Sequence, residues 1–215
     1  MYKTAIFSLI AQIITCILLL LGFFIPIGKN KSILKDLLYL EVVVQIVEIC
    51  FYVWLVYNFS KINYDVTYVR YFDWVISTPF MLLIIIIFME YINNIHIKVR
   101  DIINNDYHKL IIIFFSNFFM LFFGFLGEKN ILSKWISISL GFIFLIITFF
   151  LMFLFYVKNN NYNLTIVLIN FIIWSIYGYS FMQSYTLKNN IYNILDIFSK
   201  NITAIFIFFY VLFNH

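Results

Sequence analysis

The sequence predicts an all-α fold, a bundle of seven membrane-spanning helices, and three observations support this prediction. Of the 215 residues, 64% are hydrophobic, 22% are aromatic and only 11% are charged. A soluble domain usually has about 45–50% apolar and about 25% charged residues. The apolar residues form long runs, and at about 20 residues per crossing the chain has room for about seven spans. The composition excludes a soluble globular enzyme, a disordered chain and a disulfide scaffold.

The first three spans are predicted where apolar runs end at charged residues, asparagines or helix breakers. The first run covers residues 4–25 and ends before Pro26, which cannot donate the hydrogen bond that would continue a helix. No small-residue cleavage site follows this run, so we expect a membrane span rather than a signal peptide. The second and third runs cover residues 34–59 and 67–92.

Four further spans follow a polar segment. Residues 93–108 are rich in asparagine and charged side chains, contain His96 and His108, and are predicted as a solvent-exposed loop. After this loop, apolar runs alternate with short breaks rich in glycine, lysine or asparagine. These runs cover residues 110–126, 133–157, 164–185 and 191–213. Because no linker separates the runs, we expect residues 1–215 to form a single domain.

Seven spans place the two termini on opposite sides of the membrane. Lysine and arginine are more frequent in cytoplasmic loops. The side that would hold the C-terminus has seven such residues near the span ends and the other side has five, which favours an N-terminus outside and a C-terminus inside. The first group is Lys29, Lys31, Lys35, Lys98, Arg100, Lys109 and Lys158, and the second is Lys3, Lys61, Lys129, Lys134 and Lys188.

Charged side chains within the predicted spans indicate a structural or functional role. Inserting each one at the bilayer centre costs at least about 2.5–3.5 kcal/mol of free energy. Glu90 lies near the end of the third span and is expected among lipid headgroups. The charged residues deeper in the spans are Glu41, Glu48, Arg70, Asp73, Asp196 and Lys200.

Lys200 is the most informative of these residues. It lies about ten residues into the last predicted span, which at 1.5 Å per residue is about 15 Å deep, near the middle of the bilayer. Desolvation disfavours a charged amine there, which suits an amine that forms a Schiff base with a carbonyl compound. The alternative is a lysine that is paired with a carboxylate for packing alone.

The neighbours of Lys200 favour a functional cluster. Asp196 lies four residues before Lys200, on the same face of its helix. Arg70 and Asp73 are three residues apart and share a face of the third span. Two cations and two carboxylates form a neutral group, as a buried ion cluster requires.

Three motifs in these spans resemble the microbial rhodopsin family, seven-helix proteins that carry retinal on a lysine of the last helix. Residues 70–79, RYFDWVISTP, resemble the pattern R-Y-x-D-W-x-x-T-T-P, with Ser77 in place of the first threonine. Residues 195–200, LDIFSK, resemble L-D-x-x-x-K, and residues 174–177, WSIY, resemble W-S-x-Y. The motifs occur in the family's order and extend over most of the chain.

The resemblance implies all-trans retinal bound covalently to Lys200. It also implies that Asp73 and Asp196 are the counterions, that Asp73 is the first proton acceptor, and that Arg70 closes the cluster on the outer side. Each aromatic residue below would on its own indicate ordinary core packing, and only the motifs assign it to the chromophore. The residues that would line the polyene are Trp74, Thr78, Met120, Gly124, Trp174, Tyr177 and Phe181.

The sequence departs from the family's proton pumps at several positions. Gly178 replaces a proline of the sixth helix, Phe181 replaces a common tryptophan, and Asn117 stands where pumps carry an aspartate. Ile84 occupies the position where pumps often have the carboxylate that returns the proton from inside. No carboxylate lies between residues 182 and 195, where the best-studied pumps have their outer release pair.

The second span instead carries two glutamates. Glu41 and Glu48 are seven residues apart and share one helix face, about 10 Å apart along the axis. Carboxylates along one stripe of an apolar helix indicate a polar conduit, and the alternative is a protonated pair bonded between helices. For the serine, asparagine and glutamine residues near these glutamates, the alternative is ordinary hydrogen bonding between helices. The predicted ion path contains Ser8, Glu41, Glu48, Ser77, Asn193 and Asn201, with Gln12 and Gln45 nearby. This pattern resembles the viral rhodopsin branch, whose first group is associated with passive cation conduction.

The sequence therefore predicts a retinal-binding photoreceptor that is not an enzyme and acts as a light-gated cation channel. The alternatives are an outward proton pump, a photosensor without transport, and a seven-helix transporter or membrane enzyme without a chromophore. The expected location is a plasma or host-cell membrane, as a multi-pass protein whose gene could be viral.

The expected partners are the lipid bilayer, retinal, and small monovalent cations or protons, and a homo-oligomer is compatible with the sequence. The net charge of +4 is spread over loops and predicts no nucleic-acid partner. Cys16 and Cys50 lie inside apolar runs, so neither indicates a disulfide or a metal site.

Overall fold

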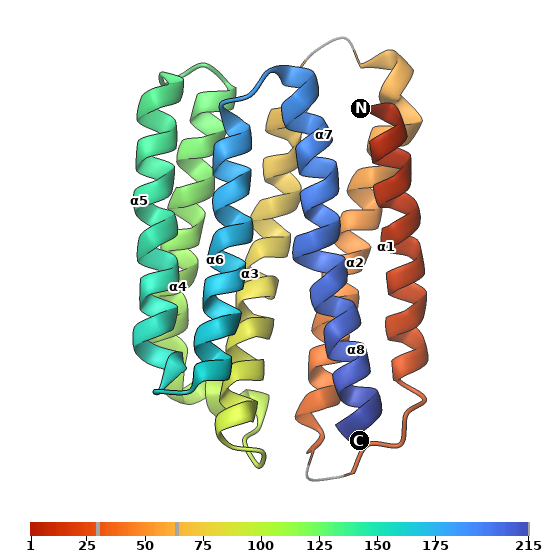
Figure 1. The fold of residues 1–215 in the computed structure, drawn as a ribbon, viewed down its shortest axis with the longest axis vertical. Helices are drawn as coiled ribbons and strands as arrows, with labels where there is room; N and C mark the ends of the chain where they lie inside the picture. The colour runs from red at the N-terminus through yellow and green to blue at the C-terminus, as the bar shows by residue number, and fades with distance from the viewer. Residues whose placement is uncertain (29–30, 63–64, 215) are drawn as a thin grey trace.

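The computed structural model describes residues 1–28, 31–62 and 65–214, and Lys29 lies outside these ranges. Within them, seven helical spans are long and apolar enough to cross a membrane, and no strand occurs, which confirms the predicted fold class (Figure 1). The last span is continuous from Tyr185 to Asn214 and contains α7, a π-helical turn and α8. The helices are α1 (Tyr2–Gly22), α2 (Ile33–Asn58), α3 (Thr67–Asn93), α4 (Val99–Glu128), α5 (Lys134–Met152), α6 (Asn161–Phe181), α7 (Tyr185–Asp196) and α8 (Ile202–Asn214).

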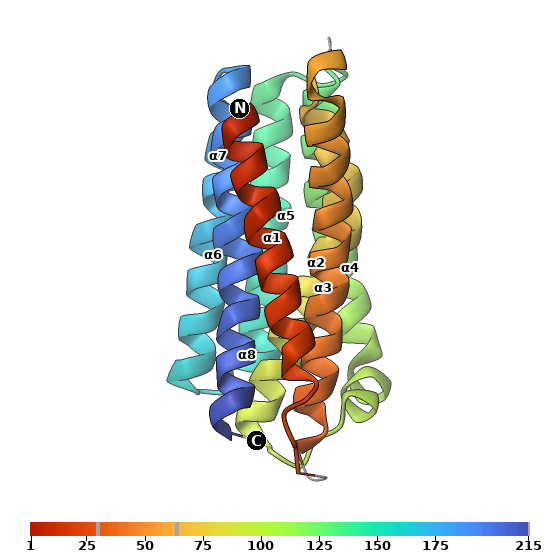
Figure 2. The ribbon, with the colours of Figure 1, turned by 90° about the vertical axis from the view of Figure 1, so that its right-hand side faces the viewer.

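The spans form a closed ring. Each packs on its neighbours along the chain, and the last span also packs on α1. Figure 2 shows α1 between α7–α8 on one side and α2 on the other. The chain begins at the upper end of Figure 1 and ends at the lower end, and we call these the N-terminal and C-terminal ends of the bundle.

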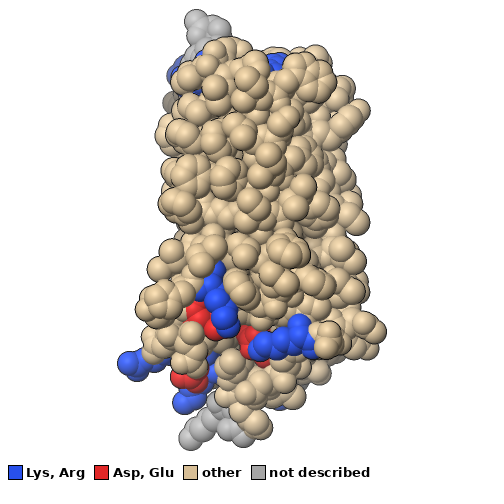
Figure 3. Space-filling view, turned by 90° about the vertical axis from the view of Figure 1, so that its left-hand side faces the viewer, with Lys and Arg blue, Asp and Glu red and all other residues tan. Residues whose placement is uncertain are grey.

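The outside of the ring is suited to lipid. Large apolar side chains such as Phe7, Trp135 and Phe213 are exposed. Figure 3 shows the face over α4 and α5, where charged side chains gather near the two ends and leave a band without charge between them. The α3 helix is the most enclosed span described, with 67% of its most apolar stretch buried, against 22% in α5.

Of the predicted helix boundaries that are wrong, two are furthest from the structure. The α4 helix begins at Val99, inside the segment predicted as a loop, because Ile102 and Leu110 are buried and give its polar start an apolar face. His108 lies on this helix and is exposed, while His96 is exposed in the turn before it.

The second wrong boundary is at the start of the last span. The α6 helix ends at Phe181 and α7 begins at Tyr185, so residues predicted as a loop are helical. Lys188 and Asn189 belong to this stretch and are buried, because partners on other helices satisfy their polar groups. Glu90, near the end of α3, is also buried, and Lys158 pairs with it at 2.6 Å.

Candidate functional site

Lys200 lies inside the bundle, in a π-helical turn (Ile197–Asn201) that joins α7 to α8. Such turns are rare in proteins, and where they occur they are often at functional sites. The residue is 2% exposed. The sequence indicated the depth of Lys200, but it carried no signal for the π turn.

Three carboxylates surround the amine of Lys200. The Nζ atom lies 3.4 Å from Asp73 Oδ2 and 3.4 Å from Asp196 Oδ1. It also contacts Oε1 of Glu48. The two aspartates were predicted beside Lys200, whereas Glu48 was predicted only as part of an ion path. The spacing of Glu48 from Glu41 indicated that both lie on one face of their helix. It did not indicate which other helix that face contacts.

Arg70 is the second cation of this cluster, and it is fully buried. Its Nη1 atom lies 3.4 Å from Asp196 Oδ2. Its Nε atom donates a hydrogen bond to Asn189 Oδ1 at 3.0 Å, and its Nη2 atom donates to Asn193 Oδ1. Arg70 therefore joins α3 to the first part of α7, toward the N-terminal end of the bundle.

The charges of the cluster do not balance when every group is ionised. Arg70 and Lys200 bring two positive charges, whereas Glu48, Asp73 and Asp196 bring three negative ones. Buried charge needs compensation, so this cluster holds either one proton on a carboxylate or one additional small cation. The sequence prediction of a neutral group of four is corrected by the position of Glu48.

Two tyrosines fix the carboxylate of Asp196. Tyr52 Oη donates to Oδ2 at 2.6 Å, and Tyr177 Oη donates to Oδ1 at 2.8 Å. Tyr177 Oη also lies 2.8 Å from Ser199 Oγ. Tyr52 was not predicted as a site residue, because it is one of 16 tyrosines in the chain and lies in no motif.

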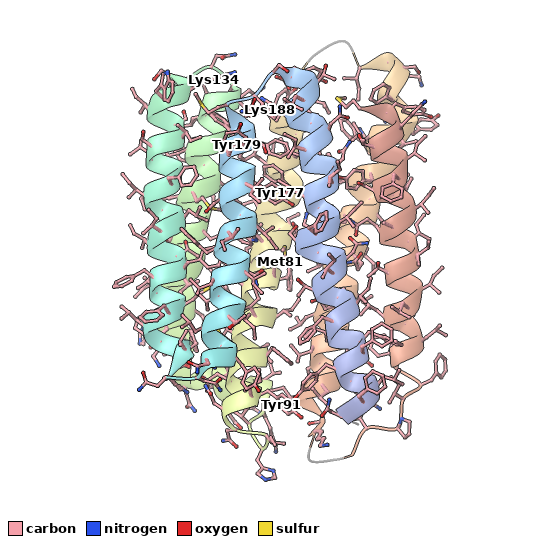
Figure 4. The ribbon with its side chains drawn as sticks, in the orientation of Figure 1. Met81, Tyr91, Lys134, Tyr177, Tyr179 and Lys188 are labelled. Carbon is pink, nitrogen blue, oxygen red and sulfur yellow. The ribbon has the colours of Figure 1, made fainter. Side chains whose placement is uncertain are left out.

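A cavity extends from Lys200 between α3, α4, α5, α6 and α7, and Figure 4 labels Tyr177 and Met81 on its walls. It encloses about 740 Å³ free of protein atoms, part of it open to the outside. All the residues predicted to line a polyene border it: Trp74, Thr78, Met120, Gly124, Trp174, Tyr177 and Phe181. The lining residues that the sequence analysis did not assign are Tyr71, Met81, Leu121, Ser137, Ile138, Gly141, Phe142, Leu145, Gly178, Tyr192 and Ser199.

The walls of this cavity fit a long, flat, apolar group with one reactive end. Ligand pockets are mostly apolar, with a few precisely placed polar groups. Two glycines allow rings to form the wall. A Cβ atom at Gly124 would lie 2.7 Å from Tyr71 Oη, and one at Gly178 would lie 2.6 Å from Phe142 Cε2. Such a lining suits an apolar polyene such as retinal, and the amine of Lys200 borders the same cavity.

A hydrogen bond between Asn117 and Thr78 connects α4 to α3 beside the cavity. Asn117 Nδ2 donates to Thr78 Oγ1 at 2.8 Å, and Thr78 Oγ1 donates to the backbone oxygen of Trp74 at 2.7 Å. The sequence analysis noted Asn117 only as a departure from pumps and did not pair it with Thr78.

The residues predicted for an ion path are buried, and several form bonds between helices. Ser8 Oγ donates to the backbone oxygen of Asn193 at 2.5 Å, and Asn201 Nδ2 donates to Thr15 Oγ1 at 2.9 Å. Ser77 is buried, and its hydroxyl interacts with the carboxyl of Asp73 on the same helix. The structure thus contains the interhelical bonds that the sequence analysis left open as the alternative.

Glu41 lies beyond Lys200 toward the C-terminal end. A smaller cavity connects the two residues and is also bordered by Asn170 and Thr203. Glu41 is 2% exposed. Glu48 and Glu41 therefore meet Lys200 differently, one by direct contact and the other across this space.

Comparisons with known proteins identify the class. The family model described as bacteriorhodopsin-like protein matches residues 3–213. The chain belongs to this family, the microbial rhodopsins, and it is an integral, multi-pass membrane protein. No curated protein matches the chain.

Among solved structures, the chain is similar to viral rhodopsin OLPVRII, with 25% identity, a TM-score of 0.86, and 99% of this chain and 98% of that chain covered. It is also similar to halorhodopsin, a light-driven chloride pump (14% identity, TM-score 0.75, coverage 99% and 95%). The proton pumping rhodopsin AR2 of the marine alga Acetabularia acetabulum is a third such structure (17% identity, TM-score 0.74, coverage 96% and 92%). The predicted resemblance to microbial rhodopsins, including a viral one, is confirmed, and the two pumps share the fold.

Proposed function

We propose that this protein is a retinal photoreceptor that acts as a light-gated cation channel, with all-trans retinal bound covalently to Lys200. The observation that carries this proposal is the buried amine of Lys200, which borders an aromatic cavity and is surrounded by three carboxylates. When bound, retinal supplies light absorption and isomerisation, and the protein supplies orientation and electrostatics. The proposal includes an N-terminus outside the cell, no enzymatic activity, and a plasma or host-cell membrane as the location.

Within this proposal, Asp73 accepts the proton that leaves Lys200. Its Oδ2 atom is 3.4 Å from the lysine, and its carboxyl interacts with the hydroxyl of Ser77, one turn further along α3. Asp196 instead accepts bonds from Tyr52 and Tyr177. A proton on Asp73 therefore competes with fewer donors than a proton on Asp196, which accepts from both tyrosines. Both aspartates act as counterions before that transfer.

Proton transfer changes the charges that hold the cluster closed. Once Asp73 is neutral, Arg70 has less negative charge near it and can shift its bonds to Asn189 and Asn193. A cation path would then open between α1, α2, α3 and the last span, where Ser8 now bonds to the backbone of Asn193. Carboxylates along such a path favour cations over anions. The residues assigned to this path are Ser8, Glu41, Glu48, Ser77, Asn193 and Asn201.

A second candidate function, an outward proton pump, is favoured by the position of Glu41. A pump needs a group that returns a proton to the lysine from the inner side, and Ile84 cannot supply one. Glu41 borders the smaller cavity that reaches Lys200. Glu41 can therefore take the donor's role from a different helix, with Asp73 as the acceptor.

Two measurements test these functions. Purification with all-trans retinal should give a visible absorption band that Lys200→Ala removes, and its absence in the unmodified protein would exclude a retinal photoreceptor. Whole-cell photocurrents should reverse direction when the cation gradient is reversed. Photocurrents that stay outward at every gradient, with acidification of the medium that an uncoupler abolishes, would assign the pump instead. A pigment without current would assign a photosensor.

A further inference from the structure

A buried ion pair lies at the N-terminal end of the bundle, outside the cluster described above. Glu128 is the last residue of α4, and Lys188 lies in the first turn of α7. The sequence places both near the membrane surface. Lys188 Nζ nevertheless donates to Glu128 Oε2 at 2.6 Å, with the two side chains 3% and 2% exposed. Figure 4 shows Lys188 near the upper end, above Tyr177.

This pair joins two helices that are not packed neighbours in the ring. The α4 helix packs on α3 and α5, whereas α7 packs on α1 and α6. The lysine therefore reaches across the interior of the bundle. An exposed ion pair contributes little to stability, and a buried one often contributes no more than an apolar pair of the same size. Stability alone therefore does not explain why this ion pair lies in the interior of the bundle.

The Glu128–Lys188 pair lies directly behind the wall of the large cavity. Lys188 Nζ is 5.9 Å from the ring centroid of Phe181, which lines that cavity. Gly127, next to Glu128, approaches the wall so closely that a Cβ atom there would lie 2.6 Å from Phe181 and 2.6 Å from Ser137 Oγ. Ser137 also lines the cavity.

The residue after Lys188 holds the same part of α7 from another side. Asn189 Nδ2 donates to Thr67 Oγ1 at 2.9 Å, and Asn189 Oδ1 accepts from Arg70 at 3.0 Å. Two consecutive residues thus attach the start of α7 to α4 and to α3. Loss of either attachment would loosen the start of α7.

We propose that the Glu128–Lys188 pair is a seal that holds the first turn of α7 over the cavity and keeps water and small nucleophiles from the bond between Lys200 and retinal. The inference rests on the retinal binding proposed above. Breaking a buried pair leaves one charge without compensation, which favours entry of water at that place. The intact pair compensates both charges at a distance of 2.6 Å, although Glu128 Oε1 accepts no hydrogen bond from the described residues. Both residues are positioning residues and touch neither the lysine nor its counterions in the contacts described.

Bleaching by hydroxylamine in the dark tests the seal on the retinal-loaded protein. This small nucleophile cleaves the lysine–retinal bond and removes the visible band, so its rate reports access. For Lys188→Met and for Glu128→Gln we expect bleaching about tenfold faster, a change equivalent to about 1.4 kcal/mol in the opening equilibrium. Because the two residues act as one unit, the double variant should bleach no faster than the faster single variant.

A matched control breaks an ion pair at the other end of the bundle. Lys158 pairs with Glu90 at 2.6 Å, and neither residue borders the cavity. Lys158→Met should bleach at the rate of the unmodified protein. Glu128→Asp keeps the charge and shortens its reach, so it provides a milder probe if the other variants fold poorly, with an expected rate between the two extremes.

The outcomes separate this inference from the function on which it rests. Unchanged bleaching in Lys188→Met, Glu128→Gln and Glu128→Asp would overturn the seal, as would an equal increase in Lys158→Met or additive effects in the double variant. If the unmodified protein forms no visible band with retinal, the proposed function fails before the seal is measured, and the seal falls with it.

Discussion

Asp73 and Asp196 lie at the same distance from Lys200, yet their surroundings differ. Asp196 is also bonded to Tyr52 and 3.4 Å from Arg70. We expect Asp196→Asn to lower the free energy of unfolding by about 3–5 kcal/mol, because the buried Arg70 loses the carboxylate that pairs with it at 3.4 Å. Asp73→Asn should cost clearly less, since Asp73 has fewer partners. Thermal unfolding of both variants checks this difference, and equal destabilisation would contradict the assignment of roles.

Gly124 provides a residue-level test of the cavity wall. A Cβ atom there would lie 2.7 Å from Tyr71 Oη. Gly124→Ala should destabilise the protein by about 1–3 kcal/mol through overpacking and reduce the yield of pigment. Gly141→Ala is the matched control, since its nearest contact is Met120 O at 3.7 Å. Alanine is better than glycine within a helix by about 0.5–1 kcal/mol, so the control should be neutral or stabilising. A melting temperature that falls equally in both would contradict this account of the wall.

At the scale of elements, hydrogen bonds attach α1 to the last span. Ser8 bonds to the backbone oxygen of Asn193, and Asn201 bonds to Thr15. If these bonds keep a cation path closed, Ser8→Ala should raise the membrane conductance in the dark, at a cost of about 0.5–1.5 kcal/mol for the lost bond. Whole-cell recording without illumination measures this. A dark conductance that matches the unmodified protein would assign the bond to structure alone, and Thr165→Ala, an exposed change on α6, is the control.

The number of spans was predictable from the sequence, but several contacts between helices were not. Long apolar runs fixed the number of spans, because a backbone in lipid must satisfy its own hydrogen bonds and forms helices. The motifs around Asp73 and Lys200 predicted which faces meet. The burial of Glu128 and Lys188 was not predictable, since each is buried only because of a partner 60 residues away. The contact of Glu48 with Lys200 likewise depends on how α2 is rotated against the last span, which its own pattern does not contain.

At the scale of the whole molecule, the termini lie at opposite ends of the bundle (Figure 1). The excess of lysine and arginine favours the C-terminal end as the cytoplasmic one. A cysteine at Lys3 should therefore react with a membrane-impermeant maleimide on intact cells, whereas one at Lys158 should react only after permeabilisation. Both tests use a Cys16→Ala, Cys50→Ala background, because the native cysteines are free. The opposite labelling pattern would reverse the proposed orientation.

In the proposed function, the amine of Lys200 alone holds the chromophore. The most direct measurement is peptide mass spectrometry of the protein after incubation with all-trans retinal and reduction with borohydride, which makes the linkage permanent. We predict a retinyl group on the peptide that contains Lys200, and on no other lysine. A retinyl group on a different lysine, or none at all, would contradict the account.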